Sequence, residues 1–428
     1  MAYTETTSTS WFDRLGSSFR GIGLGVVLII AGTILLWWNE GDFVGTGDAL
    51  REAQSVTQAL GDISKLDPSK NGQLVHATGP VVTTDTLSDP VFGISINAIR
   101  LERAVEFYQW VEKSKSEKRK KLGGGEETVT TYTYEQQWVS KPVDSSQFKD
   151  PNARTKNRNI VLASMDNFKA QAANVTFGAY RLPNFMISSI SGAVSLNATL
   201  PEATIAKLNQ ELALAAQKAR PAAPQVPQNT ADAATAPQAL ALQTLAGAIA
   251  QMVHVSGATV LLSASPSMPQ IGDVRVSFKE TRPGTVSFLA KLNGNTFEQF
   301  RASNGKTVNK LAMGTHSLEN MYGDAHSSNV TMTWILRAVG TFLVIAGLKM
   351  LVAPLAVVAD VIPLLGSIVG AGTGLVCTLL GLAWSLVIIS IAWLRSRPLI
   401  GGAMLAVAAV LIALLYVKGR SRKITATP

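Results

Sequence analysis

The clearest secondary-structure signal in this chain is the alternation of apolar and polar residues over positions 99–112. One side of an extended chain would carry Ile99, Leu101, Val105, Phe107 and Val111, and the other Arg100, Glu102, Glu106, Tyr108 and Glu112. A period of two is typical of an antiparallel strand with one buried face. Residues 128–140 are rich in Thr, Tyr, Val and Trp, which favour strands. The two runs predict one long hairpin with a highly charged insert between them.

Four apolar segments long enough to cross a bilayer predict four transmembrane helices. They occupy residues 21–38, 330–352, 368–394 and 399–417. The first ends at Trp37 and Trp38, which resemble an interfacial aromatic belt, and no small-residue cleavage site follows them. We therefore interpret the first segment as an uncleaved signal anchor.

Composition agrees with a membrane protein, because 47% of residues are hydrophobic and only 16% are charged. The mean hydropathy is +0.20. The net charge of +9 lies largely in the charged insert and at the C-terminus, so it predicts no nucleic-acid surface. The single cysteine, Cys377, excludes a disulfide framework within the chain and is expected to be a packing residue.

The distribution of basic residues predicts the orientation of the chain. With four spans, the short inward segments hold Arg14, Arg20, Lys349, Lys418, Arg420, Arg422 and Lys423. The short outward loop holds only Arg395 and Arg397. We expect residues 1–20, 353–367 and 418–428 in the cytoplasm, and residues 39–329 on the non-cytosolic side.

The fold expected for residues 39–329 is a mixed α/β, β-rich domain, either a curled sheet or a small barrel with peripheral helices. Helices are predicted over 49–63, over 159–173 by composition, from a capping box at Thr199 to Arg220, and over 238–253. Strands are predicted over 73–77, 79–83, 255–264, 272–279 and 284–292, the last two joined by a hairpin turn, ETRP. Residues 219–239, rich in Ala, Pro and Gln, read as a flexible insertion.

Small residues mark possible helix-packing faces. The first span has Gly21 and Gly25, and the third segment has Gly366, Gly370 and Gly374 at intervals of four. Such spacing lets helix backbones approach closely and favours self-association, although glycine is also tolerated in lipid-facing helices.

The charged insert offers a candidate lipid-binding surface. Its basic side chains are Lys113, Lys115, Lys118, Arg119, Lys120 and Lys121. The simpler interpretation is a solvated loop tip. The sharper one is contact with anionic lipid head groups, to which each basic residue near the surface contributes about 1 kcal/mol.

Several short motifs resemble the LUMA family, also called the transmembrane protein 43 family. They are Asn39-Glu40-Gly41, GQLVHATG at 72–79, the stretch 87–112, Tyr132 to Tyr134 with Trp138, GDVRVSF at 272–278, TWILR at 333–337, and Trp393 with Arg397 and Pro398. The resemblance implies a non-enzymatic protein that organises membrane and membrane-protein complexes, in animals with lamins and emerin. It implies the endoplasmic reticulum and inner nuclear membrane in a eukaryote, and the inner membrane in a bacterium, which the sparse cysteine and the Ala/Gln insertion suggest.

An ion pair between the first two spans follows from the same motifs. Arg337 lies six residues past Thr331, about 9 Å below the outer end of its span, where an unpaired guanidinium is costly. Glu40 closes the first span at that level. We expect Glu40 and Arg337 to pair, with snorkelling of Arg337 to the head groups as the alternative.

No catalytic, cofactor-binding or metal-binding residues are predicted. The four histidines are scattered, and the chain has no HExxH, GxSxG, P-loop or dinucleotide-binding glycine pattern. Two alternatives to a scaffold remain: a channel or transport component, and a lipid-binding regulator of membrane microdomains. Charges within the spans are few, Arg337 and Lys349, which disfavours a transport pathway. Expected partners are the lipid bilayer, further copies of the chain and other membrane proteins.

Overall fold

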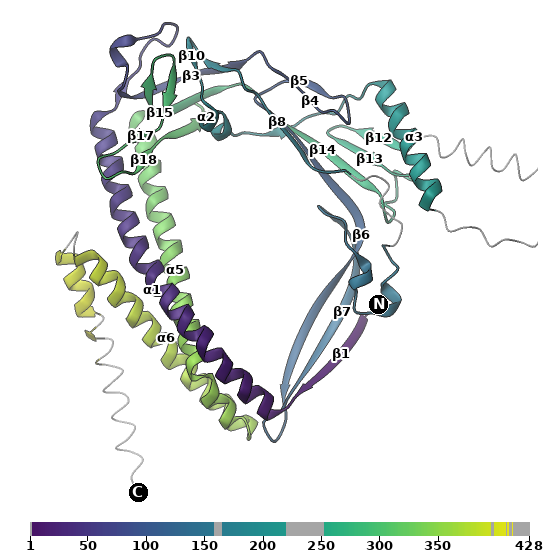
Figure 1. The fold of residues 1–428 in the computed structure, drawn as a ribbon, viewed down its shortest axis with the longest axis vertical. Helices are drawn as coiled ribbons and strands as arrows, with labels where there is room; N and C mark the ends of the chain where they lie inside the picture. Colours follow the sequence, from purple (N-terminus) through teal and green to yellow (C-terminus); the bar gives the residue numbers. More distant parts are fainter. Residues whose placement is uncertain are drawn as a thin grey trace, which may run out of the picture.

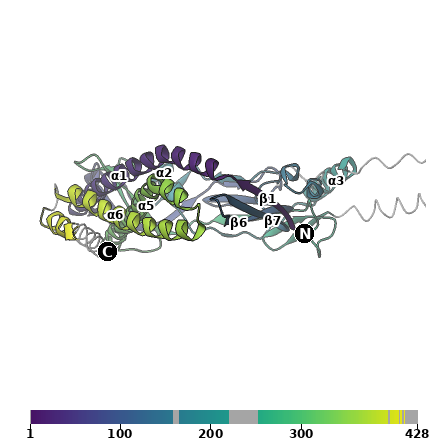
Figure 2. The ribbon, with the colours of Figure 1, turned by 90° about the horizontal axis from the view of Figure 1, so that it is seen from below.

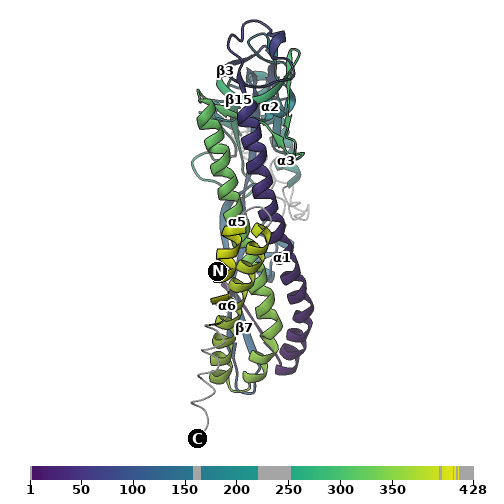
Figure 3. The same ribbon diagram turned by 90° about the vertical axis from the view of Figure 1, so that its left-hand side faces the viewer.

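The molecule is a flat, closed frame (Figure 1). A computed structural model describes residues 2–157, 165–219, 252–394, 398–407, 409–410 and 413. Long helices form one side of the frame, a β-rich domain closes one end, and a long hairpin returns along the other side to meet the far ends of the helices. Figure 2 shows the helices toward one side and the long strands toward the other. Figure 3, seen from the helical side, shows that the body is narrow.

Three helices are long and apolar enough to cross a membrane. They are α1 (Trp11–Val56), α5 (Leu318–Ala359) and α6 (Pro363–Leu394). Of the fourth expected span, the described residues show a short apolar helix, Pro398–Val407, and the rest lies outside them. The described part of the chain therefore supports three candidate spans where the sequence predicts four.

Helix α1 extends beyond its apolar segment at both ends, with a side-chain cap at its start and packing against the β-domain at its far end. The Ser10 side chain accepts a hydrogen bond from the backbone of Asp13, which satisfies a free N–H of the first turn. At the other end the helix stops at Val56, so the helix expected over 49–63 is correct only in its first half. Leu60 lies beyond it and is buried in the β-domain.

The connection between α5 and α6 is much shorter than the expected loop over 353–367. Helix α5 continues to Ala359 despite Pro354, and α6 begins at Pro363. Only residues 360–362 separate the two helices. Proline is well tolerated in the first turn of a helix, where its missing N–H costs nothing, and this allows α6 to restart at once.

The strands form two larger open sheets among the described residues. In the first, the order is β1-β7-β6-β14-β13-β12, with β11 beside β14 and β8 beside β6. Its strands are β1 (Ala2–Thr9), β6 (Arg100–Lys120), β7 (Glu126–Val139), β8 (Phe168–Gln171), β11 (Val194–Ser195), β12 (Val253–Ser256), β13 (Thr259–Leu262) and β14 (Val274–Thr281).

The second sheet has the order β10-β9-β3-β15-β16, with β19 beside β15 and β2 beside β3. Its strands are β2 (Gln58–Ala59), β3 (Leu74–Thr83), β9 (Val175–Phe177), β10 (Tyr180–Arg181), β15 (Thr285–Asn293), β16 (Thr296–Glu298) and β19 (Lys310–Met313). Two small pairs, β4 (Thr86–Ser88) with β5 (Ser95–Asn97) and β17 (Phe300–Arg301) with β18 (Thr307–Val308), complete the strands.

The long hairpin exists and is longer than predicted. Strands β6 and β7 pair from Phe107 opposite Val139 to Lys120 opposite Glu126, so most of the charged insert is strand and not loop. Alternating Lys and Ser side chains in the insert suit an exposed strand, whereas their charge had suggested a solvated loop. The expected strands 73–77 and 79–83 are one strand, β3.

Two other predictions within the β-domain are wrong. The expected hairpin across ETRP does not form, because β14 belongs to the first sheet and β15 to the second, and the chain crosses between sheets there. Of the expected helix over 159–173, residues 159–164 lie outside the described residues, and 168–171 form a strand, β8, whose pairing with β6 overrides its helical composition. Helix α3 (Glu202–Ala219) lies where the capping-box motif predicted a helix. Residues 220–251, which include most of the insertion and of the next predicted helix, lie outside the described residues.

Three apolar clusters hold the domain together and connect it to the helices. One lies in the second sheet with the short helix α2 (Asn184–Ser189), and another lies between the first sheet and α3. The third packs Ala49 and Ala53 of α1 and Tyr322 of α5 against Leu289 of β15. The helices thus enter the domain as part of its core, which predicts a stiff junction.

Candidate functional site

A metal-binding site is not found in the part of the chain that the structure describes. No group of three or more His, Cys, Asp or Glu side chains is placed to hold a metal ion among those residues. His76 and His254 each contact a backbone carbonyl, of His316 at 3.0 Å and of Ser263 at 3.1 Å. The polar clusters that stand out instead lie at two levels of the helical side of the frame.

The first cluster surrounds Glu40, which is only 1% exposed. Arg337 Nε donates to Glu40 Oε1 and Arg337 Nη2 donates to Oε2, both at 2.7 Å. This two-bond geometry is the strongest that an arginine and a carboxylate form. Trp393 of α6 also donates its indole N–H to Glu40 Oε2.

This cluster joins all three long helices. The guanidinium of Arg337 lies 4.8 Å from the ring centre of Trp334 and 5.8 Å from that of Trp393, so cation–π contacts cover its faces. Asn39 donates to the Thr333 carbonyl at 3.2 Å. The structure therefore brings Glu40 and Arg337 together, and it adds Trp393, whose role the sequence analysis missed although Trp393 stands among the family-like motifs.

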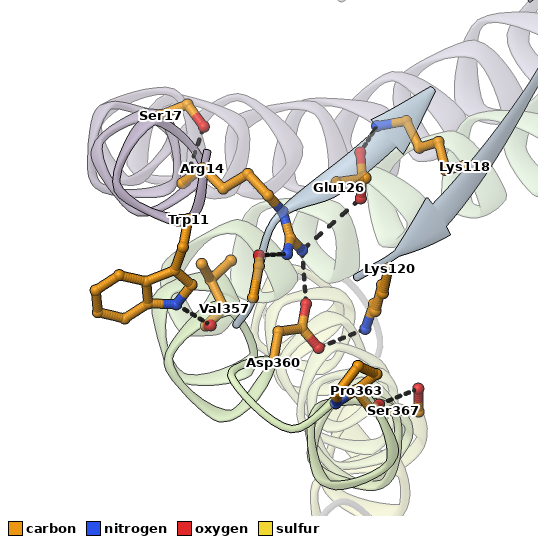
Figure 4. A network of polar contacts seen from close by, with 11 residues as sticks. Trp11, Arg14, Ser17, Lys118, Lys120, Glu126, Val357, Asp360, Pro363 and Ser367 are labelled. Atoms are coloured by element: carbon orange, nitrogen blue, oxygen red, sulfur yellow. Dashed lines mark hydrogen bonds and ion pairs between the residues drawn. The ribbon is translucent and has the colours of Figure 1, made fainter. Parts of the chain in front are cut away.

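The second cluster, which we call the tip clamp, fastens the hairpin tip to the far ends of the helices (Figure 4). Asp360, 2% exposed, accepts from Arg14 Nη2 and from Lys120 Nζ, each at 2.6 Å. Burial alone would raise the pKa of Asp360, but hydrogen bonds from Lys120 and Arg14 outweigh it and lower that pKa below 3.8. Asp360 is therefore a carboxylate at neutral pH.

Backbone contacts reinforce the tip clamp. The Gly123 N–H donates to the Val361 carbonyl at 3.1 Å, and the Trp11 indole donates to the Val357 carbonyl at 2.9 Å. Gly124 has φ of +81°, and a side chain there would overlap the Trp11 ring. The glycine run in the insert thus allows close contact between the hairpin and α1.

The tip clamp bears on the expected sidedness of the chain. The distribution of basic residues predicts the whole of 39–329 on the outer side and residues 1–20 with 353–367 on the cytoplasmic side. The structure brings Lys120, from the first region, against Arg14 and Asp360, from the other two. A bilayer cannot lie between these three side chains. The hairpin tip must therefore reach the same depth relative to the membrane as the ends of α1 and α5.

The six basic residues of the insert do not form a free cationic surface. Each lies within 4.0 Å of a carboxylate: Lys113 with Glu135, Lys115 and Arg119 with Glu117, Lys118 with Glu126, Lys120 with Asp360, and Lys121 with Glu127. Apart from Lys120, these bases are at least half exposed, so most of the pairs contribute little stability, but they do neutralise the strand. This neutrality weakens the case for head-group binding.

The glycines divide into packed and open ones. A Cβ built on Gly25 would lie 2.8 Å from the Gly347 carbonyl, and one on Gly32 would lie 2.8 Å from the Gly340 carbonyl. These contacts join α1 to α5 through glycines on α5 that the sequence analysis did not select. Their spacing of seven, matching Gly25 and Gly32, was the available signal.

The remaining predicted packing glycines have different surroundings. Gly366 lies against Asp360 in the α5–α6 turn. Added Cβ atoms on Gly21 and Gly374 meet nothing within 4 Å, and one on Gly370 meets only Ala356 at 3.9 Å. Within the described chain, the stripe over 366–374 is therefore mostly an open face.

Three long apolar helices that carry a large β-rich domain define an integral membrane protein. The model of the family described as Transmembrane protein 43 matches residues 107–398. The chain belongs to the transmembrane protein 43 family, as the motifs from Asn39 to Pro398 had suggested.

Relatives cover nearly the whole chain. Transmembrane protein 43 of Homo sapiens is 25% identical over 431 residues, covering 97% of this chain and 94% of that protein. The protein of that name from Rattus norvegicus is 25% identical over 410 residues, covering 92% and 89%. The Transmembrane protein 43 homolog of Drosophila melanogaster is 25% identical over 389 residues, covering 89% and 90%. No solved structure matches the chain significantly.

Proposed function

We propose that this protein is a non-enzymatic scaffold that organises membrane-protein complexes from a rigid, membrane-anchored frame. The observation that carries the proposal is α1, a single helix of 46 residues that runs without a break from the tip clamp through an apolar segment into the core of the β-domain. A continuous helix, fixed to α5 and α6 by the Glu40 cluster, holds the domain at a set distance from the bilayer. Such a frame suits a platform for partners better than it suits a moving part.

The proposed placement follows the basic residues of the termini. The chain would have four spans, with 399–417 as the fourth, both termini in the cytoplasm and the β-domain on the non-cytosolic side. The membrane would be the bacterial inner membrane, or the endoplasmic reticulum and inner nuclear membrane in a eukaryotic source. Expected partners are lipids, copies of this chain and other membrane proteins.

Crosslinking in native membranes followed by mass spectrometry tests the scaffold. The proposal expects reproducible crosslinks from β-domain lysines, such as Lys169 and Lys279, to a small set of other membrane proteins. Arg337→Ala, which loosens the attachment of the helices, should reduce those crosslinks, whereas Asp42→Ala on the same helix as Glu40 should not. Crosslinks confined to copies of the chain itself would contradict the proposal.

A second candidate, a channel or transport component, is favoured by one observation. Strand β1 and residues 113–120 of β6 are polar on both faces, and the hairpin runs along the side of the frame opposite the apolar helices down to the tip clamp. Polar strands at that depth need water, and a water-filled path across a bilayer conducts. Ion flux through purified protein in liposomes, absent after heat denaturation, would support this candidate, and tight liposomes would contradict it.

A further inference from the structure

Near its tip, the hairpin forms a three-stranded sheet with β1 whose two outer edges are open. Within the described chain, β1 pairs only with β7, while β14 and β8 pair with β6 only over 100–107. The outer edge of β6 therefore has no strand partner over 113–120. The two edges match in length and level, because Thr9 and Lys120 both lie opposite Glu126, and Ala2 and Lys113 both lie opposite Thr133.

This sheet lies at the depth of the apolar helical segments. Counting from Arg14 in the tip clamp, Gly21 and Trp38 lie about 10 Å and about 36 Å along α1 at 1.5 Å per residue. Counting from Lys120 at about 3.3 Å per residue, β6 reaches the same distances at residues 117 and 109. Because α1 and β6 both start at the tip clamp, the sheet around 109–117 is level with the segment of α1 that is expected in hydrocarbon (Figure 1).

Hydrocarbon cannot surround such a sheet. At this depth its charged side chains are Glu5, Glu112, Lys113, Lys115, Glu117 and Glu135. A charge near mid-bilayer costs about 2.5 to 3.5 kcal/mol on insertion scales. Open strand edges add unsatisfied backbone groups, which do not occur in lipid. The sheet must therefore lie in water while the helices on the opposite side of the frame lie in lipid.

We propose that copies of this chain assemble head to tail in the membrane, the β6 edge of one pairing with the β1 edge of the next. The sheets then close around a polar, water-filled centre, and the helices form the lipid-facing outside. The partner recognised by each edge is a second copy. This arrangement concerns how copies meet, and it holds whether the assembly serves as a scaffold or as a channel.

Symmetry selects this pairing over the alternatives. Copies inserted in one orientation are related by an axis along the membrane normal. Strands β1 and β6 run in the same direction, because each is antiparallel to β7. A β6-to-β1 contact is therefore parallel and head to tail, which closes into a ring. Pairing β1 with β1 of another copy would be antiparallel and would require one copy to be inverted in the bilayer.

The charges of the sheet allow it to pack beside its copies. Together with the turn residue Lys121, it holds six bases and six acids: Lys113, Lys115, Lys118, Arg119, Lys120 and Lys121, with Glu5, Glu112, Glu117, Glu126, Glu127 and Glu135. The sheet has no net charge, and the Glu5 edge of one copy meets the lysine-rich edge of the next. Lysines on an edge strand often prevent it from pairing with a strand of another chain. A monomeric protein is therefore the outcome that the experiment must exclude.

Disulfide crosslinking tests the contact in native membranes, in full-length protein with Cys377→Ser. The test variant carries Thr6→Cys with Glu117→Cys, and a second carries Thr6→Cys with Lys115→Cys to allow a shift of two residues. Thr6 and Glu117 lie opposite the same residue, Val129, from either side. They are two strands apart in one chain, about 9.5 Å, which is beyond the reach of a disulfide. Any link therefore joins two copies.

Oxidation should shift at least one double variant from monomer to a ladder of dimers, trimers and a largest closed species. Thr6→Cys alone, and Val129→Cys on the central strand, should stay monomeric. Both double variants remaining monomeric, while mass photometry of the wild-type protein in nanodiscs finds single copies, would overturn the proposal. Dimers from Thr6→Cys alone would overturn it too, because they would show β1 paired with β1.

Discussion

At the scale of single residues, the Glu40 cluster is the clearest link between sequence and structure. An arginine six residues inside a span and a glutamate at the end of another predicted a pair, because each is expensive in a membrane without the other. The indole of Trp393 could not be predicted in the same way, since tryptophan beside a membrane usually marks the interface and not a hydrogen bond to a buried acid. The energetic cost of an unpaired charge in a membrane predicts Glu40 and Arg337 as partners. The contact with Trp393 follows only from the packing of α6.

The first prediction concerns the stability of this cluster. Arg337→Ala leaves Glu40 buried and unpaired, and removing one partner of a buried pair costs about 3–5 kcal/mol. Glu40→Ala should cost less, because the Arg337 side chain is 14% exposed and can extend toward head groups. The double variant should cost clearly less than the sum. Thermal unfolding in detergent measures all three.

Asp42→Ala is the matched control for that cycle. Asp42 is on the same helix and pairs with Lys306, but both side chains are about one-third exposed, so its loss should cost at most about 1 kcal/mol. Additive costs for Glu40 and Arg337, or equal costs for Asp42 and Glu40, would contradict the assignment of a buried pair.

The second prediction concerns pH. Burial lowers the pKa of His76 below 6.5, more than its contact with the His316 carbonyl raises it. The unfolded chain then binds a proton more readily than the folded one, so stability is complete above about pH 6.5 and falls as pH drops below it. The midpoint of thermal unfolding of the β-domain should decrease from pH 7.5 to pH 5. His76→Gln should reduce this dependence, and an unchanged slope would contradict it.

At the scale of elements, the sequence predicted those with strong internal periodicity. The hairpin, α3 and the three long helices all carry their own pattern, and each appears. The wrong expectations concern pairing between distant segments: nothing local tells that β14 and β15 join different sheets, or that Phe168 to Gln171 pairs with β6. Where strands form is decided more by pairing between distant segments than by the local preference of the residues.

The third prediction tests the packing of α1 against α5. Gly25→Ala places a methyl group against the Gly347 carbonyl, and overpacking of this kind costs about 1–3 kcal/mol. Gly23→Ala, two residues earlier where nothing lies within 4 Å, is the matched control and should be neutral or stabilising. Equal effects of the two substitutions on thermal unfolding would show that this helix face meets only lipid.

At the scale of the whole molecule, closure of the frame depends on the tip clamp. The hairpin, the first span and the segment over 353–367 were each predicted from sequence, but nothing in the sequence indicated that they meet. Their meeting depends on the full length of β6, which was expected to end at the charged insert. Once the strand continues through the insert, its tip reaches Arg14 and Asp360.

The fourth prediction follows from this closure. Asp360→Asn removes the charge that Arg14 and Lys120 share, and it should release the hairpin tip. Amide hydrogen exchange should then rise over β1 and the adjoining part of β7, while the β3–β15 pairing in the domain stays protected. Glu127→Gln, which breaks only the exposed pair with Lys121, is the control and should leave exchange unchanged.

The closed frame itself is tested most directly by a crosslink between its two legs. In the Cys377→Ser background, Leu122→Cys on the hairpin tip is next to Gly123, and Val361→Cys in the α5–α6 turn is at the residue whose carbonyl accepts the Gly123 hydrogen bond. A short bismaleimide applied to native membranes should join the two cysteines within one chain, read as a linked peptide by mass spectrometry. Both cysteines reacting singly with maleimide, but never with each other, would contradict the closed frame.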